Sequence, residues 1–361
     1  MDIERLLRAM VEQEASDLFL KVGTHPFLRI HGKLIPIGSE KIPQKQIVEA
    51  ATELMGPHLR QQFHADRELN FAFEQPGIGR FRANVLWQQG TMALVIRRVN
   101  RAIPSLEELR LPVEVLSRLM TQQHGLILVT GPTGSGKSTT ISAMLDHLNR
   151  TSAKHIMTLE DPIEFLFEEE QAIINQREIG VDTRSFSEGL RSTLRQSPDV
   201  LFVSDIRDRE TMDAALLAAE AGQLVLSCLH TTNVITTIER IVAFFPSSQH
   251  LLMRLRLSVV LRGVVSLRLL PRSDGGGRIP ACEILTATPR VRELIREGRT
   301  DELPATIHDG AMQGMQTFTQ ALYQRYRSGE VSLEEALRYA DSPDELQLAV
   351  REIRSTRDTQ R

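Results

Sequence analysis

Apolar residues follow two different spacings along this chain, and the change of spacing divides it in two. Up to Arg98, short stretches alternate apolar and polar positions or repeat apolar residues at helical spacing, which predicts a small α+β module. The predicted elements are a helix over Ile3–Glu14, strands over Asp17–Val22 and Phe27–Ile30, a helix over Gln46–Met55, and strands over Leu69–Glu74, Gly79–Leu86 and Met92–Arg97. The last two strands flank Gly90, which favours a hairpin.

From Val113 onwards, wholly apolar runs alternate with helical stretches. Runs of this kind are typical of strands buried on both faces, so the pattern predicts a parallel sheet covered by helices on both sides. The intervening segment contains Pro104 and Pro112 and is predicted to be a linker with a short helical turn. The expected fold class is therefore α/β, with domains over residues 1–98 and 113–361 and a linker over residues 99–112.

A glycine-rich segment, Gly131-Pro-Thr-Gly-Ser-Gly-Lys-Ser138, lies between the apolar run Leu126–Val129 and a predicted helix. In such a loop the glycines let backbone N–H groups surround phosphates, Lys137 reaches the outer phosphates, and the hydroxyl of Ser138 binds Mg²⁺. The chain is therefore predicted to bind a nucleoside triphosphate with Mg²⁺. The candidate nucleotide-binding residues are Gly131, Pro132, Thr133, Gly134, Ser135, Gly136, Lys137, Ser138 and Thr139.

Acidic side chains follow a second predicted strand, His155–Leu159. Glu160, Asp161 and Glu164 come after it, where open α/β sheets build their sites, so these residues are candidates for orienting or activating an attacking water. Acidic residues after a strand also act as helix caps or as solvated loop charges. The phosphate loop in the same sheet favours catalysis.

Two more apolar strands end in polar residues. Asp199–Val203 runs into Asp205, which is a candidate catalytic acid and, with Ser138, a candidate Mg²⁺ ligand. Gln223–Leu229 ends at His230, where a histidine can sense the γ-phosphate. A lone histidine is more often a structural hydrogen-bonding residue, but its place at the end of a strand favours a functional one.

The overall composition indicates an ordinary globular chain. A net charge of −3 gives no overall attraction to nucleic acid. The arginines from Arg254 to Arg278 lack interleaved aromatic residues, and the apolar residues between them predict packed helices, so we expect no nucleic-acid partner. Cys228 and Cys282 lie in apolar stretches and are predicted to be buried free thiols. Because neither a membrane span nor a signal peptide is recognisable, we expect a cytoplasmic protein that reaches a membrane through partners.

Four segments, by their order along the chain and their sequences, resemble the Walker A, Asp, Walker B and His boxes of secretion ATPases, and more narrowly those of the PilT family of type IV pilus retraction ATPases. The matching segments are Gly131–Ser138, Thr158–Glu164, Ser197–Asp208 and Ala218–Thr232, with further likeness at Ala15–Leu18, Gly79–Asn84, Asn175–Glu178, Ala281–Leu285 and Gly314–Phe318. The tail over Phe318–Leu348 resembles the PilU group, the accessory retraction ATPases. The likeness therefore extends over nearly the whole chain.

This resemblance implies a PAS-like N-terminal domain, a RecA-like P-loop ATPase domain with a helical C-terminal part, and a homo-hexameric ring with nucleotide between subunits. Such rings act on the inner-membrane platform protein of the pilus, at the inner face of that membrane, and couple ATP hydrolysis to pilus disassembly and twitching motility. An arginine acting in trans is expected, because its guanidinium stabilises phosphoryl oxygens across a subunit boundary, although each candidate is as readily a solvated surface residue. The candidates are Arg80, Arg82, Arg97, Arg195 and Arg278.

Two positions depart from the family pattern. Asp205 stands where the family has glutamate, which retracts the carboxylate by roughly an ångström, a misplacement that can cost about 10²-fold in rate. Gln223 stands where the His box begins with histidine, and an amide does not titrate. Two functions therefore stay open, a hexameric ATPase motor or a weakly hydrolysing accessory subunit that works with a more active paralogue of the PilT type. A RecA-like nucleic-acid translocase is disfavoured by the acidic balance.

Overall fold

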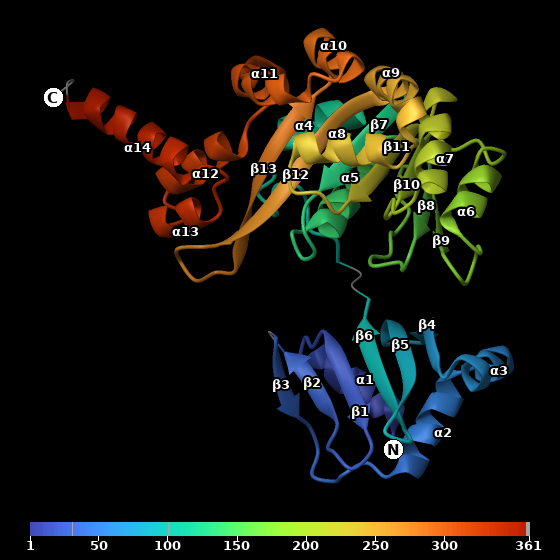
Figure 1. Cartoon of the computed structure of the whole chain (residues 1–361). Helices are drawn as coiled ribbons and strands as arrows, with labels where there is room; N and C mark the ends of the chain where they lie inside the picture. Colours follow the sequence, from blue (N-terminus) through green and yellow to red (C-terminus); the bar gives the residue numbers. More distant parts are fainter. Residues whose placement is uncertain (31, 100–101, 359–361) are drawn as a thin grey trace. The chain divides into compact units, whose positions relative to one another are not determined.

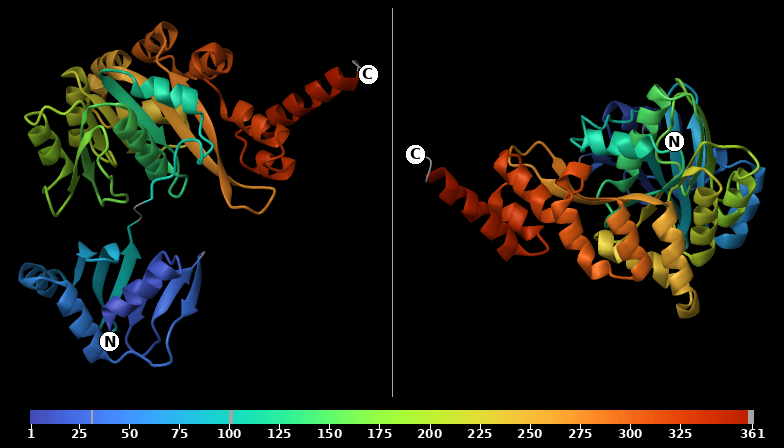
Figure 2. Two further views of the ribbon diagram at one scale, coloured as in Figure 1. Left: turned by 180° about the vertical axis from the view of Figure 1, so that it is seen from behind. Right: turned by 90° about the horizontal axis from the view of Figure 1, so that it is seen from above.

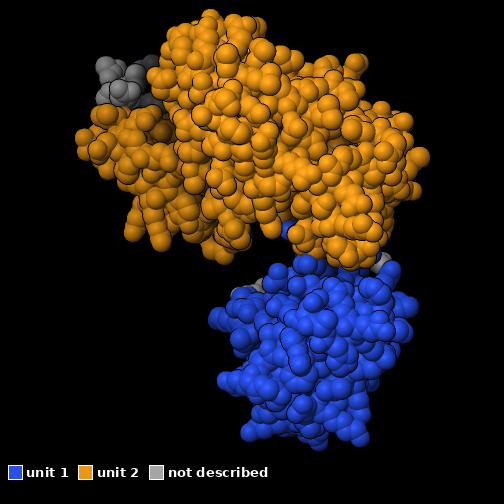
Figure 3. Space-filling view, turned by 45° about the vertical axis from the view of Figure 1, so that its right-hand side comes forward, with its two compact units in different colours: residues 1–101, 164–166 blue, residues 102–163, 167–361 orange. Residues whose placement is uncertain are grey.

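The computed structural model describes residues 1–30, 32–99 and 102–358. It divides the chain into two compact units, one formed by Met1–Arg101 with Glu164–Leu166 and the other by Ala102–Ile163 with Phe167–Arg361 (Figure 3). Residues 100–101 of the expected linker and residues 359–361 of the expected second domain lie outside the described residues.

The described part of the first unit is a six-stranded antiparallel sheet with three helices, in the strand order β3-β2-β1-β6-β5-β4 (Figure 1). Its elements are α1 (Ile3–Glu12), β1 (Asp17–Lys21), β2 (Phe27–Ile30), β3 (Lys33–Pro36), α2 (Gln44–Leu54), α3 (Pro57–Asp66), β4 (Glu68–Gln75), β5 (Gly79–Gln88) and β6 (Thr91–Arg98). The strands β5 and β6 form the expected hairpin at Gly90. The pattern of the sequence missed β3, a short exposed edge strand, and α3, whose apolar stripe is reduced to one buried residue, Phe63.

One face of this sheet carries the core of the first unit. Alternate residues such as Leu18, Phe81, Ala83, Leu94 and Ile96 are buried and pack with residues of the helices in one apolar cluster. The helix α1 lies behind the strands in Figure 1 and in front of them in the rear view of Figure 2. Because strand side chains alternate between faces, the residues between these core positions point to the opposite face.

The second unit, in its described part, contains a seven-stranded sheet in the order β13-β12-β7-β11-β10-β8-β9. Every neighbouring pair is parallel except β12 and β13. The strands are β7 (Gly125–Thr130), β8 (His155–Glu160), β9 (Ile173–Glu178), β10 (Val200–Val203), β11 (Leu224–Leu229), β12 (Leu261–Pro271) and β13 (Arg278–Thr286). The helices are α4 (Val113–Met120), α5 (Lys137–Thr151), α6 (Phe186–Thr193), α7 (Arg209–Glu220), α8 (Val234–Ala243), α9 (His250–Val260), α10 (Pro289–Glu297), α11 (Leu303–Asp309), α12 (Phe318–Arg327), α13 (Leu333–Arg338) and α14 (Pro343–Asp358), with short 3₁₀ helices η1 (Ser247–Gln249), η2 (Thr300–Glu302) and η3 (Ala311–Gln313).

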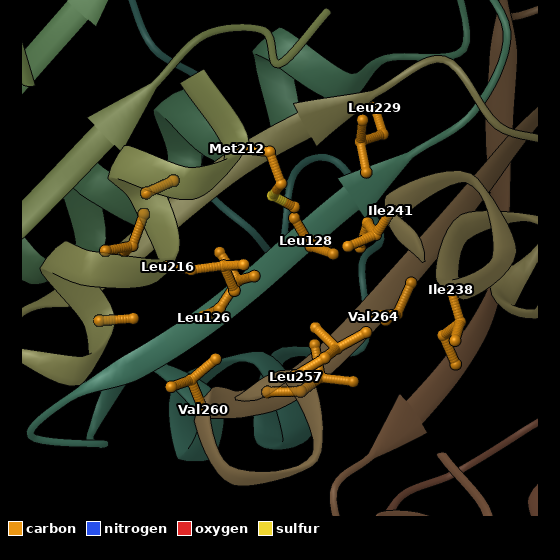
Figure 4. Packing of buried hydrophobic residues seen from close by; sticks show 14 of the residues in the cluster. Leu126, Leu128, Met212, Leu216, Leu229, Ile238, Ile241, Leu257, Val260 and Val264 are labelled. Carbon is orange, nitrogen blue, oxygen red and sulfur yellow. The ribbon is translucent and has the colours of Figure 1, made fainter. Parts of the chain in front are cut away.

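The strand β7 shows why this sheet is covered on both faces. All six of its residues are buried, and the four from Leu126 to Val129 alternate between two apolar clusters. Leu126 and Leu128 pack with α7, α8 and α9 in one cluster (Figure 4), while Ile127 and Val129 pack with α4 and α5 in the other. A strand buried on both faces must be apolar throughout, so the run read from the sequence and the observed position agree.

The structure corrects one expectation in this unit. The arginine-rich stretch was expected to form packed helices throughout, but only Arg254 and Arg256 lie on a helix, α9. Arg262 and Arg268 lie on β12, which pairs with β13 in an antiparallel hairpin. On β12, Gly263 allows close packing against α4, because a Cβ at this position would lie 2.8 Å from the side chain of Leu119.

Two further expectations concern the cysteines and membrane spans. Cys228 and Cys282 are buried and form no disulfide bond, as predicted. In the part of the chain that the structure describes, no helix is long and apolar enough to cross a membrane.

Candidate functional site

The phosphate loop connects the end of β7 to the first turn of α5. Gly131, Gly134 and Gly136 all have positive φ angles, at 149°, 79° and 93°. At Gly131 a side chain is excluded as well, because its Cβ would lie 2.7 Å from the carbonyl oxygen of Leu267. The glycines are therefore required by backbone conformation and, at Gly131, by space.

The loop ends in a helix N-terminus that no side chain caps. Gly136 is the N-cap residue of α5 and has no side chain to accept hydrogen bonds from the first turn. The free N–H groups of a first turn and the helix dipole together favour an anion at this point. The same loop therefore has the geometry of a phosphate site before any side chain is considered.

Lys137 is buried in this loop, at 7% exposure. Its Nζ donates hydrogen bonds to the carbonyl oxygens of Gly131 and Pro132, at 2.9 and 3.0 Å. It also donates to Nδ1 of His230 at 3.3 Å. A phosphate oxygen would compete with these neutral acceptors for an ammonium that is already directed into the loop.

His230 connects the phosphate loop to Asp205. An ammonium has no lone pair, so Nδ1 of His230 accepts from Lys137, and the ring proton of a neutral His230 lies on Nε2. This Nε2 donates to Oδ2 of Asp205 at 3.2 Å. Lys137, His230 and Asp205 thus form one series of hydrogen bonds across the ends of β7, β11 and β10, which are neighbours in the sheet.

Asp205 is buried, at 6% exposure, and its two oxygens have different surroundings. Oδ2 also accepts a hydrogen bond from Nε of Arg207 at 2.6 Å. That hydrogen bond and the negative charge of Asp205 raise the pKa of Arg207 above its ordinary value. Oδ1 is buried and has no hydrogen-bond partner among the described residues, so it can accept from a water or a ligand.

The free oxygen of Asp205 bears on the expected Mg²⁺. Mg²⁺ is commonly held by one or two protein oxygens together with phosphates and water, and its preferred donors are hard oxygens. Ser138 and Asp205 supply donors of this kind. Among the described residues no three His, Cys, Asp or Glu side chains gather as a metal cluster. The donor set therefore fits Mg²⁺.

Glu160 and Asp161 lie at the end of β8, next to β10. Oε1 of Glu160 accepts hydrogen bonds from Oγ1 of Thr158 at 2.7 Å and from Nε2 of Gln176 at 3.0 Å. The backbone N–H of Asp161 donates to Oγ of Ser204 at 3.2 Å. The bond to Ser204 joins the Asp box to the residue before Asp205, so the two acidic segments meet at one edge of the sheet.

The structure separates the remaining candidates. Nη1 of Arg278, at the start of β13, lies 3.5 Å from the carbonyl oxygen of Gly134, so this arginine is at the phosphate loop of its own chain. Arg195 is exposed in the turn before β10, at the edge opposite the phosphate loop. The phosphate loop and Asp205 belong to the second unit. The remaining candidates belong to the first unit and are Arg80, Arg82, Arg97 and Glu164.

Gln223 also lies away from the phosphate loop. It precedes β11 at the end of that strand opposite His230, and at about 3.3 Å per residue the two residues are roughly 20 Å apart. Its side chain is buried, and its Oε1 has no hydrogen-bond partner among the described residues. Within one subunit, this departure from the family pattern changes a residue remote from the phosphates.

Sequence reasoning missed the residues that hold the site in place. Oγ1 of Thr130, the last residue of β7, bonds Oγ of Ser266 at 2.8 Å, and Thr237 on α8 bonds Thr231 at 2.7 Å. Hydroxyls on distant strands and helices leave no local pattern that could have found them. Thr158 was more accessible to prediction, because it precedes Glu160 by two positions on a strand and so shares its face.

The chain is similar to known proteins over nearly its whole length. A family model described as "Type II/IV secretion system protein" matches residues 1–338. The type IV pilus ATPase PilU of Pseudomonas aeruginosa is 42% identical over 351 residues, which are 97% of this chain and 92% of that protein. The chain therefore belongs to the family of type II/IV secretion system proteins. The type IV pilus retraction ATPase PilT of the same organism is 42% identical over 344 residues, which are 95% of this chain and 99% of that protein.

Two solved structures also match the chain over most of its length. The crystal structure of the pilus retraction motor PilT with bound ADP matches with a TM-score of 0.90 and 42% identity, covering 96% of this chain and 99% of that one. The X-ray structure of the Legionella pneumophila ATPase DotB matches with a TM-score of 0.76 and 27% identity, over 92% of this chain and 94% of that one. The resemblance to the PilT family and the expected α/β fold class are both confirmed.

Proposed function

We propose that this chain is an ATPase motor of the pilus retraction type, which assembles as a homo-hexamer and couples ATP hydrolysis to pilus disassembly. Two relatives that match nearly its whole length, PilU and PilT, are ATPases by name, and a similar solved structure is that of a PilT with bound ADP. The chain is accordingly a nucleotide-binding ATPase. The observation that supports a working site is the hydrogen-bonded series from Lys137 through His230 to Asp205.

Each side chain of the site has a distinct task in this proposal. Lys137 and the first-turn N–H groups of α5 neutralise the outer phosphates, and Lys137 leaves its carbonyl partners to do so. Bound at Ser138, with Asp205 alongside, Mg²⁺ would supply further neutralisation of phosphate charge. Asp205, Glu160 and Asp161 orient the attacking water, and His230 reports the phosphate state to Asp205 because it contacts both Lys137 and that carboxylate.

A second candidate function is that of an accessory subunit. Two observations favour it. Asp205 stands where the family has glutamate, and the chain is as similar to PilU as to PilT, at 42% identity to each. In this alternative the chain binds nucleotide, hydrolyses it slowly, and works in a mixed assembly with a more active paralogue of the PilT type.

The partners and location follow from the same proposal. We infer that the chain works in the cytoplasm at the inner face of the inner membrane, where it meets the platform protein of the pilus. One or more of Arg80, Arg82, Arg97, Arg195 and Arg278 would reach a phosphate bound to a neighbouring subunit. For Arg278 the contact with the phosphate loop of its own chain favours a contribution in cis.

A complementation experiment separates the two functions. The chain and its Lys137→Ala variant are each expressed in pilated cells that lack retraction ATPases, with and without a PilT-type paralogue, and retraction events are counted. A motor restores retraction alone and fails as Lys137→Ala. An accessory subunit increases retraction only beside the paralogue. Absence of any effect in all four strains contradicts both functions.

A further inference from the structure

The outer face of the first unit's sheet carries a row of charged residues from four neighbouring strands. Arg29 on β2 is opposite Asp17 on β1, Asp17 is opposite Arg97 on β6, and Arg97 is opposite Arg82 on β5. Residues directly opposite each other in a sheet point to the same face. The neighbours Leu18, Leu28, Ala83 and Ile96 occupy the core face, so this row points away from the core.

Asp17 is the buried member of this row. Its side chain is only 4% exposed, and its Oδ1 accepts a hydrogen bond from Nε of Arg97 at 2.8 Å. Its Oδ2 lies 3.3 Å from Nε of Arg29 and accepts a hydrogen bond from Oγ of Ser16 at 2.8 Å. A carboxylate on an outer strand face is ordinarily solvated, and here it lies beneath two guanidinium groups instead.

Arg97 is held by one end only. Asp17 engages Nε, and the described residues provide Arg97 with no second hydrogen bond, while its side chain is 66% exposed. Arg29 differs, because its guanidinium also lies over the ring of Phe19, at 5.0 Å from the centroid. The two terminal Nη atoms of Arg97 thus stay available, and the hydrogen bond at Nε fixes the direction in which they point. A pair of guanidinium N–H donors can bind two phosphoryl oxygens at once.

We propose that Asp17 is a positioning residue for catalysis, which fixes Arg97 so that its Nη atoms meet the phosphates of a nucleotide bound to a neighbouring subunit. This inference rests on the proposed function, because it requires ATP hydrolysis in an assembly where an arginine acts in trans. An exposed arginine side chain loses much rotational freedom when it binds, and a fixed Nε removes part of that loss before the nucleotide arrives. The effect falls on the transition state, where charge on the phosphoryl oxygens is redistributed.

The test is a double-mutant cycle of Asp17→Asn and Arg97→Ala in the full chain, read as kcat and KM for MgATP. Asp17→Asn should lower kcat about tenfold with KM changed less than about twofold, because the nucleotide is held mainly by the phosphate loop. Arg97→Ala should lower kcat by more than that. In the Arg97→Ala background, Asp17→Asn should have no further effect.

Two more variants distinguish a loss of catalysis from a loss of folding. Arg97→Lys keeps the charge at an exposed site but removes both the Nε donor and the Nη fork, so it should lower kcat at least as much as Asp17→Asn does. Glu49→Gln on α2, where Glu49 lies 3.9 Å from Lys45, makes the same change of charge at an exposed site of the same unit and should leave kcat unchanged.

The outcomes distinguish this inference from the proposed function. No turnover above the Lys137→Ala variant means that the proposed function fails and the inference with it. Normal turnover that is insensitive to Arg97→Ala or to Asp17→Asn overturns the inference alone. An equal loss on Asp17→Asn with and without Arg97 also overturns it, because Asp17 would then act independently of Arg97.

Discussion

Replacing Asp205 by asparagine is expected to disable hydrolysis while leaving the fold nearly unchanged. The asparagine side chain has almost the shape of aspartate, but it would turn two hydrogen bonds to a carboxylate, from Arg207 and His230, into bonds to a neutral amide. A hydrogen bond to a charged group contributes about 1.5–3 kcal/mol and a neutral one about 1 kcal/mol. The side chains of Arg207 and His230 are 66% and 50% exposed, so water replaces most of the difference.

The two effects of this substitution therefore differ greatly in size. The free energy of unfolding should fall by less than about 1 kcal/mol, because both partners can be hydrated. Turnover should fall about 10²-fold or more, because a water or Mg²⁺ bound at Oδ1 would lose the negative charge beside it, and a positioned acid or base contributes on the order of 10²–10⁴-fold.

The assay combines phosphate release under saturating MgATP with urea unfolding of the same samples. Nucleotide binding, followed with a fluorescent ADP analogue, should stay within about threefold of the natural chain, since Lys137 and the loop remain. If the Asp205→Asn chain kept at least half of the natural turnover, the assignment of Asp205 to the chemistry would be wrong. If it lost several kcal/mol of stability, the primary contribution of Asp205 would be structural.

Three further predictions follow. Lys137→Ala should abolish hydrolysis, because the point charge at the phosphates is lost, and unchanged turnover in a phosphate-release assay would contradict the site. Asp205→Glu should raise turnover if the shortened acid limits the rate, because the exposed side chains of Arg207 and His230 can move to admit one methylene. A lower turnover would mean that the pocket is adapted to aspartate. Burial raises the pKa of Glu283 from 4.5 to about 7, so the folded chain favours the protonated side chain. The contribution of Glu283 to the free energy of unfolding is therefore full below about pH 4.5 and is lost as the pH rises through about 7, a change of about 3 kcal/mol. Urea unfolding between pH 5 and pH 8 should show this slope in the natural chain and a flatter one in Glu283→Gln, which still accepts from the N–H of Val234; equal slopes would refute it.

Local features of the site could be predicted from the sequence, and its long-range connections could not. The phosphate loop was recognisable because the glycines, Lys137 and the preceding apolar strand lie within one short segment. The contact between Lys137 and His230 joins residues 93 positions apart, and it depends on the order in which β7, β11 and β10 pair. Apolar runs predict that strands exist, but they do not state which strands are neighbours.

The same distinction explains the errors in the fold. The helix α3 has a single buried residue, Phe63, so hydrophobic spacing provides almost no signal for it. The segment of β12 was read as helical because a short apolar run fits either type of element until its partner strand is known. The row from Arg29 to Arg97 belongs to this class as well, since it appears only when β2, β1 and β6 are set in register.

The most direct test of the account is steady-state ATP hydrolysis by the purified natural chain with Mg²⁺, measured on the fraction that light scattering identifies as hexamer-sized, with Lys137→Ala as the blank. The account predicts turnover well above the blank in that fraction. Bound nucleotide with turnover no greater than the blank would contradict an autonomous motor.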